Sequence, residues 1–466
     1  MAAQRPAAAT KLPVPALPRP AAPAARLILT PDPADANVAQ SFGFLILCIY
    51  LLAAYANEFA VRALGIKPYI TTVTLAMLPV ALIASGNLFR CLRDTIGRLW
   101  LAFLVCMCLA VPFSLWRGGS VLLLRDYVAR NWMMFLLIAG FAISLKHLRW
   151  LMGVTIAASM LLLVDCFVAA RLTNGRLEIG ESIFFSNAND LCLQLALAIT
   201  QFLYLFFQPQ LWQRVLALLG IAGAFLYSLQ TGSRGGTLAL MALMVVIFIF
   251  GKHKVVMVAV VCVAGMVAIV VVPAAAFHRI SLLVNDDTPL TQSDLSATAS
   301  RTQRLELLRQ SLVFTVTHPV FGVGPGQFPV AVNGEDEKQG KRAPWLGTHN
   351  SYTEVSSECG IPAFLFYTSV VILCILSNLR TYQRSKNDPR LLQVSALAFS
   401  LMCGSVVFAV ATFFYHIAYS GYLPALGGMT VALRLITDRS LWGPRRTIPA
   451  MVPRVGLAGQ FSKGVA

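Results

Sequence analysis

The sequence has few charged residues for its length. Only 12% of the 466 residues are Asp, Glu, Lys or Arg, whereas 57% are hydrophobic. Soluble domains carry about 25% charged residues, so this composition excludes a compact soluble fold and a disordered chain. Apolar runs recur along the chain with a length of about 20 residues, which is the length that crosses a bilayer as a helix.

Several common site motifs are also missing. The ten cysteines form no CxxC pair, so the sequence indicates neither a zinc site nor a redox motif. No P-loop signature accompanies the glycine-rich segment 318–328, so we expect a tight turn there and no nucleotide site. From these absences we expect no metal and no cofactor.

The apolar runs predict an all-α polytopic membrane protein with about 12 transmembrane helices. We expect the helices near residues 41–61, 68–87, 99–116, 122–145, 148–170, 188–207, 211–230, 232–250, 255–276, 359–379, 391–413 and 415–436.

The same runs divide the chain into five parts. Helices 1–9 occupy residues 41–276 and helices 10–12 occupy residues 359–436, with one large extracytoplasmic loop at 277–358 between them. Residues 1–40 are rich in Ala and Pro and lack the apolar core of a signal peptide, so we expect a disordered cytoplasmic tail. Residues 437–466 form a basic cytoplasmic tail.

The charge distribution predicts the orientation of the chain in the bilayer. The formal net charge is +17. If the number of helices is even, both tails lie on one side, and that side contains most of the Lys and Arg residues and few acids. Cytoplasmic loops carry such an excess, so we expect both termini in the cytoplasm. Because the basic residues are spread over several loops, we expect no nucleic-acid partner.

The segment Thr231–Gly236 interrupts two apolar runs at the outer boundary of the membrane. A full span must begin near its start, which brings Arg234 into that boundary. The helix runs inward, so its partly positive N-terminus faces outward. Ser233 can cap it and Gly235 allows close backbone approach, which suits a phosphate or diphosphate. The alternative is an interfacial arginine that snorkels to water.

A second polar segment lies just outside the membrane, ahead of the tenth expected helix. It contains His349, Asn350 and Tyr352. Histidine titrates near pH 6.5, so His349 can take a proton from an attacking hydroxyl. The residues between His349 and Gly360 can form a short amphipathic helix. The alternative is an inert surface histidine, but its location on the same face as Arg234 favours a functional role.

Two further groups lie on this outer face. Arg301, Arg304 and Arg309 follow a helical pattern within the loop, and such a basic helix can meet a lipid head group or a substrate phosphate. A solvated face is the alternative for that helix. Asn187 and Asn189 stand at the outer start of the sixth expected helix, where they can bind sugar hydroxyls, although capping explains them equally well.

These elements together resemble the O-antigen ligase family, which shares a domain with O-antigen polymerases and some protein O-oligosaccharyltransferases. The run from Arg234 to Leu238 is similar to the R-x3-L element of that family. His349, followed by ten residues and Gly360, is similar to its H-x10-G element. Their order, spacing and common outer face make the combination specific.

A third part of the resemblance lies between these two elements. Arg304 and the segment 318–326 resemble the opening of the large periplasmic loop of the family. Leu308 departs from the tryptophan of many members, and Cys359 departs from the usual Glu-Leu-Gly sequence. The resemblance covers roughly residues 185–410.

The resemblance implies a metal-independent glycosyltransferase at the periplasmic face of a bacterial inner membrane. Its donor is a glycan on undecaprenyl diphosphate, and its acceptor is a sugar hydroxyl on lipid A core for a ligase. His349 is implied as the base or acceptor-positioning group, while Arg234 and Arg304 bind the diphosphate and stabilise its departing charge. With the residue patterns above, the diphosphate site also includes Arg301, Ser233 and Gly235, and the candidate sugar or acceptor contacts are Asn350, Tyr352, Asn187 and Asn189.

Three alternatives stay open. An O-antigen or exopolysaccharide polymerase transfers the glycan to another lipid-linked chain, and a protein O-oligosaccharyltransferase transfers it to a protein. A 12-helix transporter is a more distant alternative, because the segment Asp94–Arg98 weakly resembles a major-facilitator loop. Such transporters divide into six plus six helices around a long cytoplasmic loop, whereas the long loop expected here is extracytoplasmic.

Overall fold

The computed structural model describes residues 37–65, 69–173, 176–179, 187–251, 254–271, 292–338, 340 and 345–438. The tails expected at 1–40 and 437–466 lie outside these residues, apart from the few that adjoin the first and last helices.

Most described residues are helical. The α-helices are α1 (Val38–Leu64), α2 (Ile70–Ala84), α3 (Thr95–Ala110), α4 (Arg117–Asp126), α5 (Met133–Phe141), α6 (Leu145–Ala169), α7 (Ala188–Phe206), α8 (Leu211–Gln230), α9 (Arg234–Phe250), α10 (Lys254–Val271), α12 (Gln292–Thr317), α13 (Phe328–Lys338), α14 (Ser351–Ser385), α15 (Leu392–Ala411) and α16 (Tyr422–Thr437). Short elements are η1 (Arg90–Arg93), η2 (Val111–Phe113), the π-helix η3 (Tyr127–Trp132), η4 (Pro389–Leu391) and the paired strands β1 (Arg171–Thr173) and β2 (Arg176–Glu178).

The helices account for a multi-pass membrane protein. Among the described residues, six helical segments are long and apolar enough to cross a bilayer: Thr95–Phe113, Leu145–Ala169, Ala188–Phe206, Leu211–Gln230, Ser351–Ser385 and Pro389–Ala411. A described helix overlaps each expected span, including the shorter apolar ones. The chain is therefore an all-α membrane protein, and the count of about 12 crossings stays a prediction.

The two most buried spans, α7 and α15, form the centre of the bundle. α15 packs against α7, α9, α14 and α16. The Ser400 hydroxyl of α15 donates a hydrogen bond to the carbonyl of Thr200 in α7 at 2.6 Å, and Gly404 lets the helices approach closely. Small and hydroxyl side chains are typical of helix contacts within membranes, where the hydrophobic effect does not favour one apolar neighbour over another.

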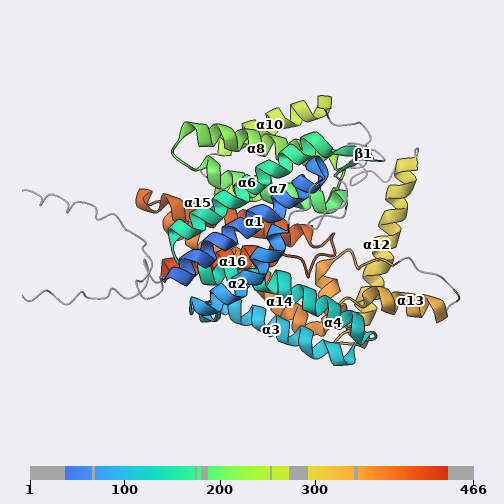
Figure 1. Cartoon of the computed structure of the whole chain (residues 1–466). Coiled ribbons are helices and arrows are strands. Elements are labelled where there is room, and N and C mark those ends of the chain that lie inside the picture. The colour runs from blue at the N-terminus through green and yellow to red at the C-terminus, as the bar shows by residue number, and fades with distance from the viewer. Residues whose placement is uncertain are drawn as a thin grey trace, which may run out of the picture.

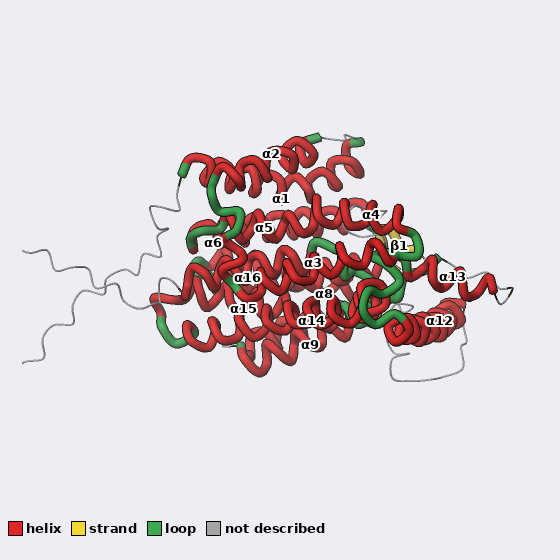
Figure 2. The backbone as a smooth tube through the Cα atoms, turned by 90° about the horizontal axis from the view of Figure 1, so that it is seen from below, coloured by secondary structure: helices red, strands yellow, loops and turns green. Residues whose placement is uncertain are grey.

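The two ends of the bundle differ (Figure 1, Figure 2). α1 begins and α16 ends at one end, whereas α12, α13 and the β1–β2 hairpin lie at the other. α12 runs across the direction of the spans (Figure 1). We call the end with α12 the outer end. In its described part, the segment expected as a loop at 277–358 includes α12, α13 and the start of α14.

α14 begins before the expected tenth span at residue 359. Asn350 caps its first turn, because the side-chain oxygen accepts hydrogen bonds from the backbone N–H groups of Tyr352 and Thr353. The helix bends at Gly360, whose φ of 84° lies in the left-handed region. The expected short helix between His349 and Gly360 is confirmed as the first part of α14.

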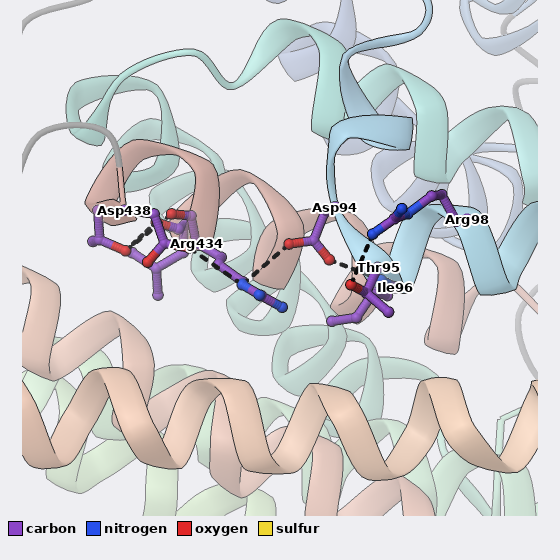
Figure 3. A network of polar contacts seen from close by, with 8 residues as sticks. Asp94, Thr95, Ile96, Arg98, Arg434 and Asp438 are labelled. Carbon is purple, nitrogen blue, oxygen red and sulfur yellow. Dashed lines mark hydrogen bonds and ion pairs between the residues drawn. The ribbon is translucent and has the colours of Figure 1, made fainter. Parts of the chain in front are cut away.

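A carboxylate joins α3 to α16 at the end opposite α12 (Figure 3). Asp94 caps α3 by accepting a hydrogen bond from the N–H of Ile96 at 2.8 Å, and its other oxygen lies 3.2 Å from Nε of Arg434. The same nitrogen lies 3.3 Å from the exposed carboxylate of Asp438. The segment that weakly resembles a transporter motif thus has a structural role here.

We expect Asp94→Ala to lower the free energy of unfolding by about 1–3 kcal/mol, because it removes both a cap and a buried partner of Arg434. Thermal unfolding of the detergent-solubilised protein measures the change. Asp438→Ala is the matched control, since an exposed ion pair contributes only about 0–1 kcal/mol. An equal loss in both variants would contradict the assignment.

Candidate functional site

The start of α9 lies within a polar network at the outer end. Ser233 caps this helix by accepting a hydrogen bond from the N–H of Gly236, so the cap expected from the sequence is confirmed. Its hydroxyl lies 2.9 Å from Oδ1 of Asn189 and 2.9 Å from the hydroxyl of Tyr415. Arg234 follows as the first residue of α9 and is half-buried. The starts of α7 and α9 therefore meet beside Tyr415.

The β1–β2 hairpin adds an arginine to this network. Nη2 of Arg176 donates a hydrogen bond to Oδ1 of Asn189 at 2.8 Å, and its Nε donates to the carbonyl of Thr231 at 2.9 Å. The guanidinium thus ties the hairpin to the turn that precedes α9. We did not single out this arginine from the sequence.

The glycines at the start of α9 permit tight packing within the protein. A Cβ atom on Gly235 would lie 2.6 Å from Cβ of Phe414, and one on Gly236 would overlap Sγ of Cys192. The close backbone approach expected at Gly235 therefore serves contact with Phe414, and a role in binding phosphate stays a prediction.

The loop that joins α15 to α16, residues 412–421, connects this network to the start of α14. We call it the α15–α16 loop. The backbone N–H of Ser351 donates to the carbonyl of Thr412 at 2.8 Å, and its hydroxyl donates to the carbonyl of Tyr415 at 2.7 Å. The N–H of Ile417 donates back to that hydroxyl at 2.9 Å. Ser351 thus holds the loop on both sides of His416.

His349 and His416 form a histidine pair beside Ser351. Their ring centroids lie 4.8 Å apart, and the rings are nearly perpendicular, at 86°. His349 has a φ of 52°, which is uncommon for a residue other than glycine. Gly347 lies against the other ring, where an added Cβ would be 2.7 Å from Cδ2 of His416. The backbone is therefore shaped to bring the two imidazoles together.

The surroundings of the histidine pair keep His349 neutral. Partial burial lowers the pKa of His349 to about 4, and the positive charges of His416 and Arg304 add to this effect. Partial desolvation also lowers the pKa of His416, where Asp190 acts in the opposite direction and Arg304 in the same one. Arg304 of α12 and Asp190 of α7 therefore act on the same pair of rings.

The structure brings some expected site residues together and gives others supporting roles. His349 and Arg304 are electrostatically coupled. The amide oxygen of Asn350 caps α14, and the buried Tyr352 donates its hydroxyl to the carbonyl of Ala409 at 3.0 Å. The side chain of Arg301 lies outside the described residues.

The two asparagines expected near the sixth span also differ. Asn187 caps α7, as the alternative interpretation predicted, and its amide nitrogen donates to the carboxylate of Asp190 at 3.1 Å. Asn189 belongs to the polar network that contains Ser233. Sugar binding by either asparagine stays a prediction.

The glycine-rich segment 318–328 is the tight turn expected from the sequence, since Gly322, Gly324 and Gly326 all have positive φ. The buried carboxylate of Glu358 holds this turn. It accepts hydrogen bonds from the N–H groups of Gly326 at 2.7 Å and Phe328 at 3.1 Å.

Two contacts fix the far side of the α15–α16 loop. The hydroxyl of Tyr419 donates to the carboxylate of Glu358 at 2.9 Å, which links the loop to the glycine turn. The amide of Asn131, in the π-helix η3, donates to the carbonyl of Tyr419 at 2.6 Å. π-Helical turns occur often at functional sites. The start of α9, helix α14 and the π-helix η3 therefore all contact this loop.

The sequence interpretation did not identify His416. The expected spans 391–413 and 415–436 leave a single residue between them, which places His416 inside a helix. That boundary is wrong, because α15 ends at Ala411 and α16 begins at Tyr422. The useful signal was the polar and aromatic content of residues 412–422. Among the described residues, no group of three His, Cys, Asp or Glu side chains is placed to hold a metal ion.

We expect Gly236→Ala to lower the free energy of unfolding by about 1–3 kcal/mol, because the added methyl group displaces Cys192. Cys192→Ala in the same chain should restore part of this loss, as measured by thermal unfolding in detergent. Gly153→Ala in α6 is the control, since its new Cβ meets nothing within 4 Å. A Gly236→Ala protein as stable as the control would refute the packing interpretation.

Comparison with known protein families covers part of the chain. Residues 215–368 match the family described as O-antigen ligase, and this region contains Arg234, Arg304 and His349. No curated protein matches the chain. The α15–α16 loop, which contributes the second histidine, lies beyond the matched region. Over residues 215–368 the chain is therefore similar to the O-antigen ligase family.

Proposed function

We propose that this protein transfers a glycan from undecaprenyl diphosphate to a sugar hydroxyl on the periplasmic face of a bacterial inner membrane. The family indicates a membrane glycosyltransferase-like role in polysaccharide biosynthesis. The observation that carries the finer proposal is the neutral His349 beside Arg304, within the matched region and at the outer end of the bundle. In this arrangement His349 is the base, and Arg304 is the group that binds the diphosphate.

The reaction follows from these two groups. His349 accepts the proton of the acceptor hydroxyl, and the oxygen forms a bond to the anomeric carbon of the donor glycan. The bond from that carbon to the diphosphate oxygen breaks, and undecaprenyl diphosphate leaves with the bonding electrons. Arg234 and Arg304 stabilise the negative charge that develops on the leaving group. A metal ion is not required for that step, because arginine binds phosphate oxygens in pairs.

The low pKa of His349 suits a site that binds an anionic donor. Burial, His416 and Arg304 keep the imidazole neutral, so that it can accept a proton. The negative charge of a bound diphosphate offsets the nearby positive charges and therefore raises the pKa toward neutrality. His349 thus becomes a stronger base when the donor is present.

The proposed location uses the orientation of the bundle. α1 begins and α16 ends opposite the outer end (Figure 1), and the basic short loops predict that both termini are cytoplasmic. The histidine pair would then face the periplasm, where a lipid-linked glycan and lipid A core meet. A polymerase or a protein O-oligosaccharyltransferase would use the same base and the same arginines on another acceptor.

We expect His349→Ala and Arg234→Ala each to abolish glycan transfer while the protein still inserts into the membrane. Lipopolysaccharide gels of a deletion strain that expresses each variant provide the measurement. Loss of a ligase leaves bare core and lipid-linked polymer, whereas loss of a polymerase leaves core with one repeat unit. Arg234→Lys should also be poor, because lysine cannot bind phosphate through two parallel hydrogen bonds. Normal transfer in both alanine variants would refute the assignment.

The pH dependence of kcat/KM tests the state of His349 in the free protein. Because the pKa of His349 is lowered to about 4, its neutral form persists at mildly acidic pH, and activity should fall only as pH approaches that value. His416→Phe keeps an aromatic ring but removes a positive charge, so the midpoint should rise yet stay below the ordinary histidine value of about 6.5. A wild-type midpoint near the ordinary value, or no shift in the variant, would contradict this account.

A further inference from the structure

The described side chains of α12, from Thr302 to Thr317, form three distinct faces. The first face packs on the protein. Leu307 and Ser311 are buried, and the hydroxyl of Thr315 lies 2.7 Å from that of Ser356 in α14. Contacts of this kind fix the rotation of α12 about its own axis.

The second face is apolar and exposed. Leu305, Leu312 and Val316 have exposed fractions of 58%, 50% and 76%. Residues at positions i, i+7 and i+11 lie along one line of a helix with 3.6 residues per turn. We call these three residues the outer apolar face of α12. No described part of the chain covers them to the extent that the first face is covered.

The third face is polar and also exposed. It contains Gln303, Glu306 and Thr317, which lie about a quarter to a half turn away from the outer apolar face. The exposed side of α12 is therefore amphipathic. That division is typical of a helix that lies at the boundary between a bilayer and water.

The outer apolar face is continuous with the membrane surface of the bundle. The N–H of Ile361, where α14 continues beyond its bend, donates to the carbonyl of Pro319 at 2.8 Å. Val320, next to that proline, is exposed, as is Leu365 one turn along α14. The C-terminal end of α12 therefore lies level with the start of the membrane-crossing part of α14.

A second contact places this end of α12 at the same level. The ring of Phe321 stacks on that of Phe113, with centroids 4.1 Å apart. Phe113 is the last residue of the apolar span that begins with α3. α12 then runs across the bundle end and not away from it (Figure 1). Its exposed apolar side chains therefore border the outer surface of the bilayer.

We propose that α12 lies in the outer surface of the bilayer, with its outer apolar face against the acyl chains of phospholipids. Arg309 lies beside this face and is exposed, and its guanidinium lies 3.7 Å from the carboxylate of Glu306. A long arginine side chain in this place reaches lipid phosphates while its aliphatic part stays among the acyl chains. The occupant is the bilayer itself.

This contact has a consequence for the site, beyond the proposed function. Arg304 lies on the protein side of α12 and acts on both rings of the histidine pair. A helix that contacts both the bundle and the bilayer is fixed in its depth relative to the membrane and in its rotation about its own axis. Phospholipid contact thus adds to the protein contacts that position the guanidinium of Arg304.

Site-specific photocross-linking tests the proposal without any measurement of activity. Val316→p-benzoylphenylalanine and Glu306→p-benzoylphenylalanine are expressed separately in cells that incorporate an alkyne-tagged fatty acid into phospholipids. After irradiation, a fluorophore attached to the alkyne reports the lipid joined to the protein. We expect roughly fivefold more lipid on the Val316 variant, because position 306 faces water. Leu365→p-benzoylphenylalanine is the reference for full lipid contact.

Three results would overturn the proposal. The first is lipid labelling at position 316 no stronger than at position 306, while position 365 is labelled. The second is a covalent dimer at position 316, which would make the outer apolar face a contact between two copies. The third is attachment of the polyprenyl donor in place of phospholipid, identified by mass spectrometry of the cross-linked protein because that donor contains no tagged fatty acid. Leu312→p-benzoylphenylalanine serves as a second probe if the Val316 variant is poorly expressed.

Discussion

Capping the first turns of α7, α9 and α14 is the constraint on which the outer end depends. A helix start has backbone N–H groups without partners inside the helix. Ala188, Gly235 and Ser351 in the first turns of α7, α9 and α14 are buried, so these N–H groups need partners from the protein. Asn187, Ser233 and Asn350 supply side-chain oxygens for α7, α9 and α14. The three capped starts lie at one end of the bundle, so their polar side chains form a common network there. The candidate site develops from that network.

The α15–α16 loop makes one site out of these separate starts. Tyr415 reaches the cap of α9, Ser351 holds the loop to the start of α14, and Tyr419 meets the carboxylate that binds the glycine turn. The histidine pair lies between these attachments. A base must be held in one orientation to accept a proton, and burial with neighbouring positive charge keeps it in the neutral form. The packing of the α15–α16 loop against the helix starts thus sets both the orientation of His349 and its lowered pKa.

Local patterns in the sequence predicted the local features well. Helix spans, the cap at Ser233 and the turn at 318–328 each follow from composition or stereochemistry within about ten residues. His416 and Arg176 could not be found in this way. Each contacts a partner that lies far away in the sequence. In addition, the hydropathy averaged over a window of about 20 residues does not separate the short α15–α16 loop from the helices on either side of it. The position of Arg304 beside His349 likewise depends on how α12 packs, which no local pattern specifies.

The segment from His349 to Gly360 has a length requirement as well as an end-residue requirement. Both of its ends have left-handed backbone, at φ values of 52° and 84°, and ten helical or capping residues separate them. An added or deleted residue would rotate one end relative to the other by about 100°. Ser351 and Glu358 could then no longer face their separate partners together. The number of residues between His349 and Gly360 is therefore a requirement of the site, in addition to the histidine itself.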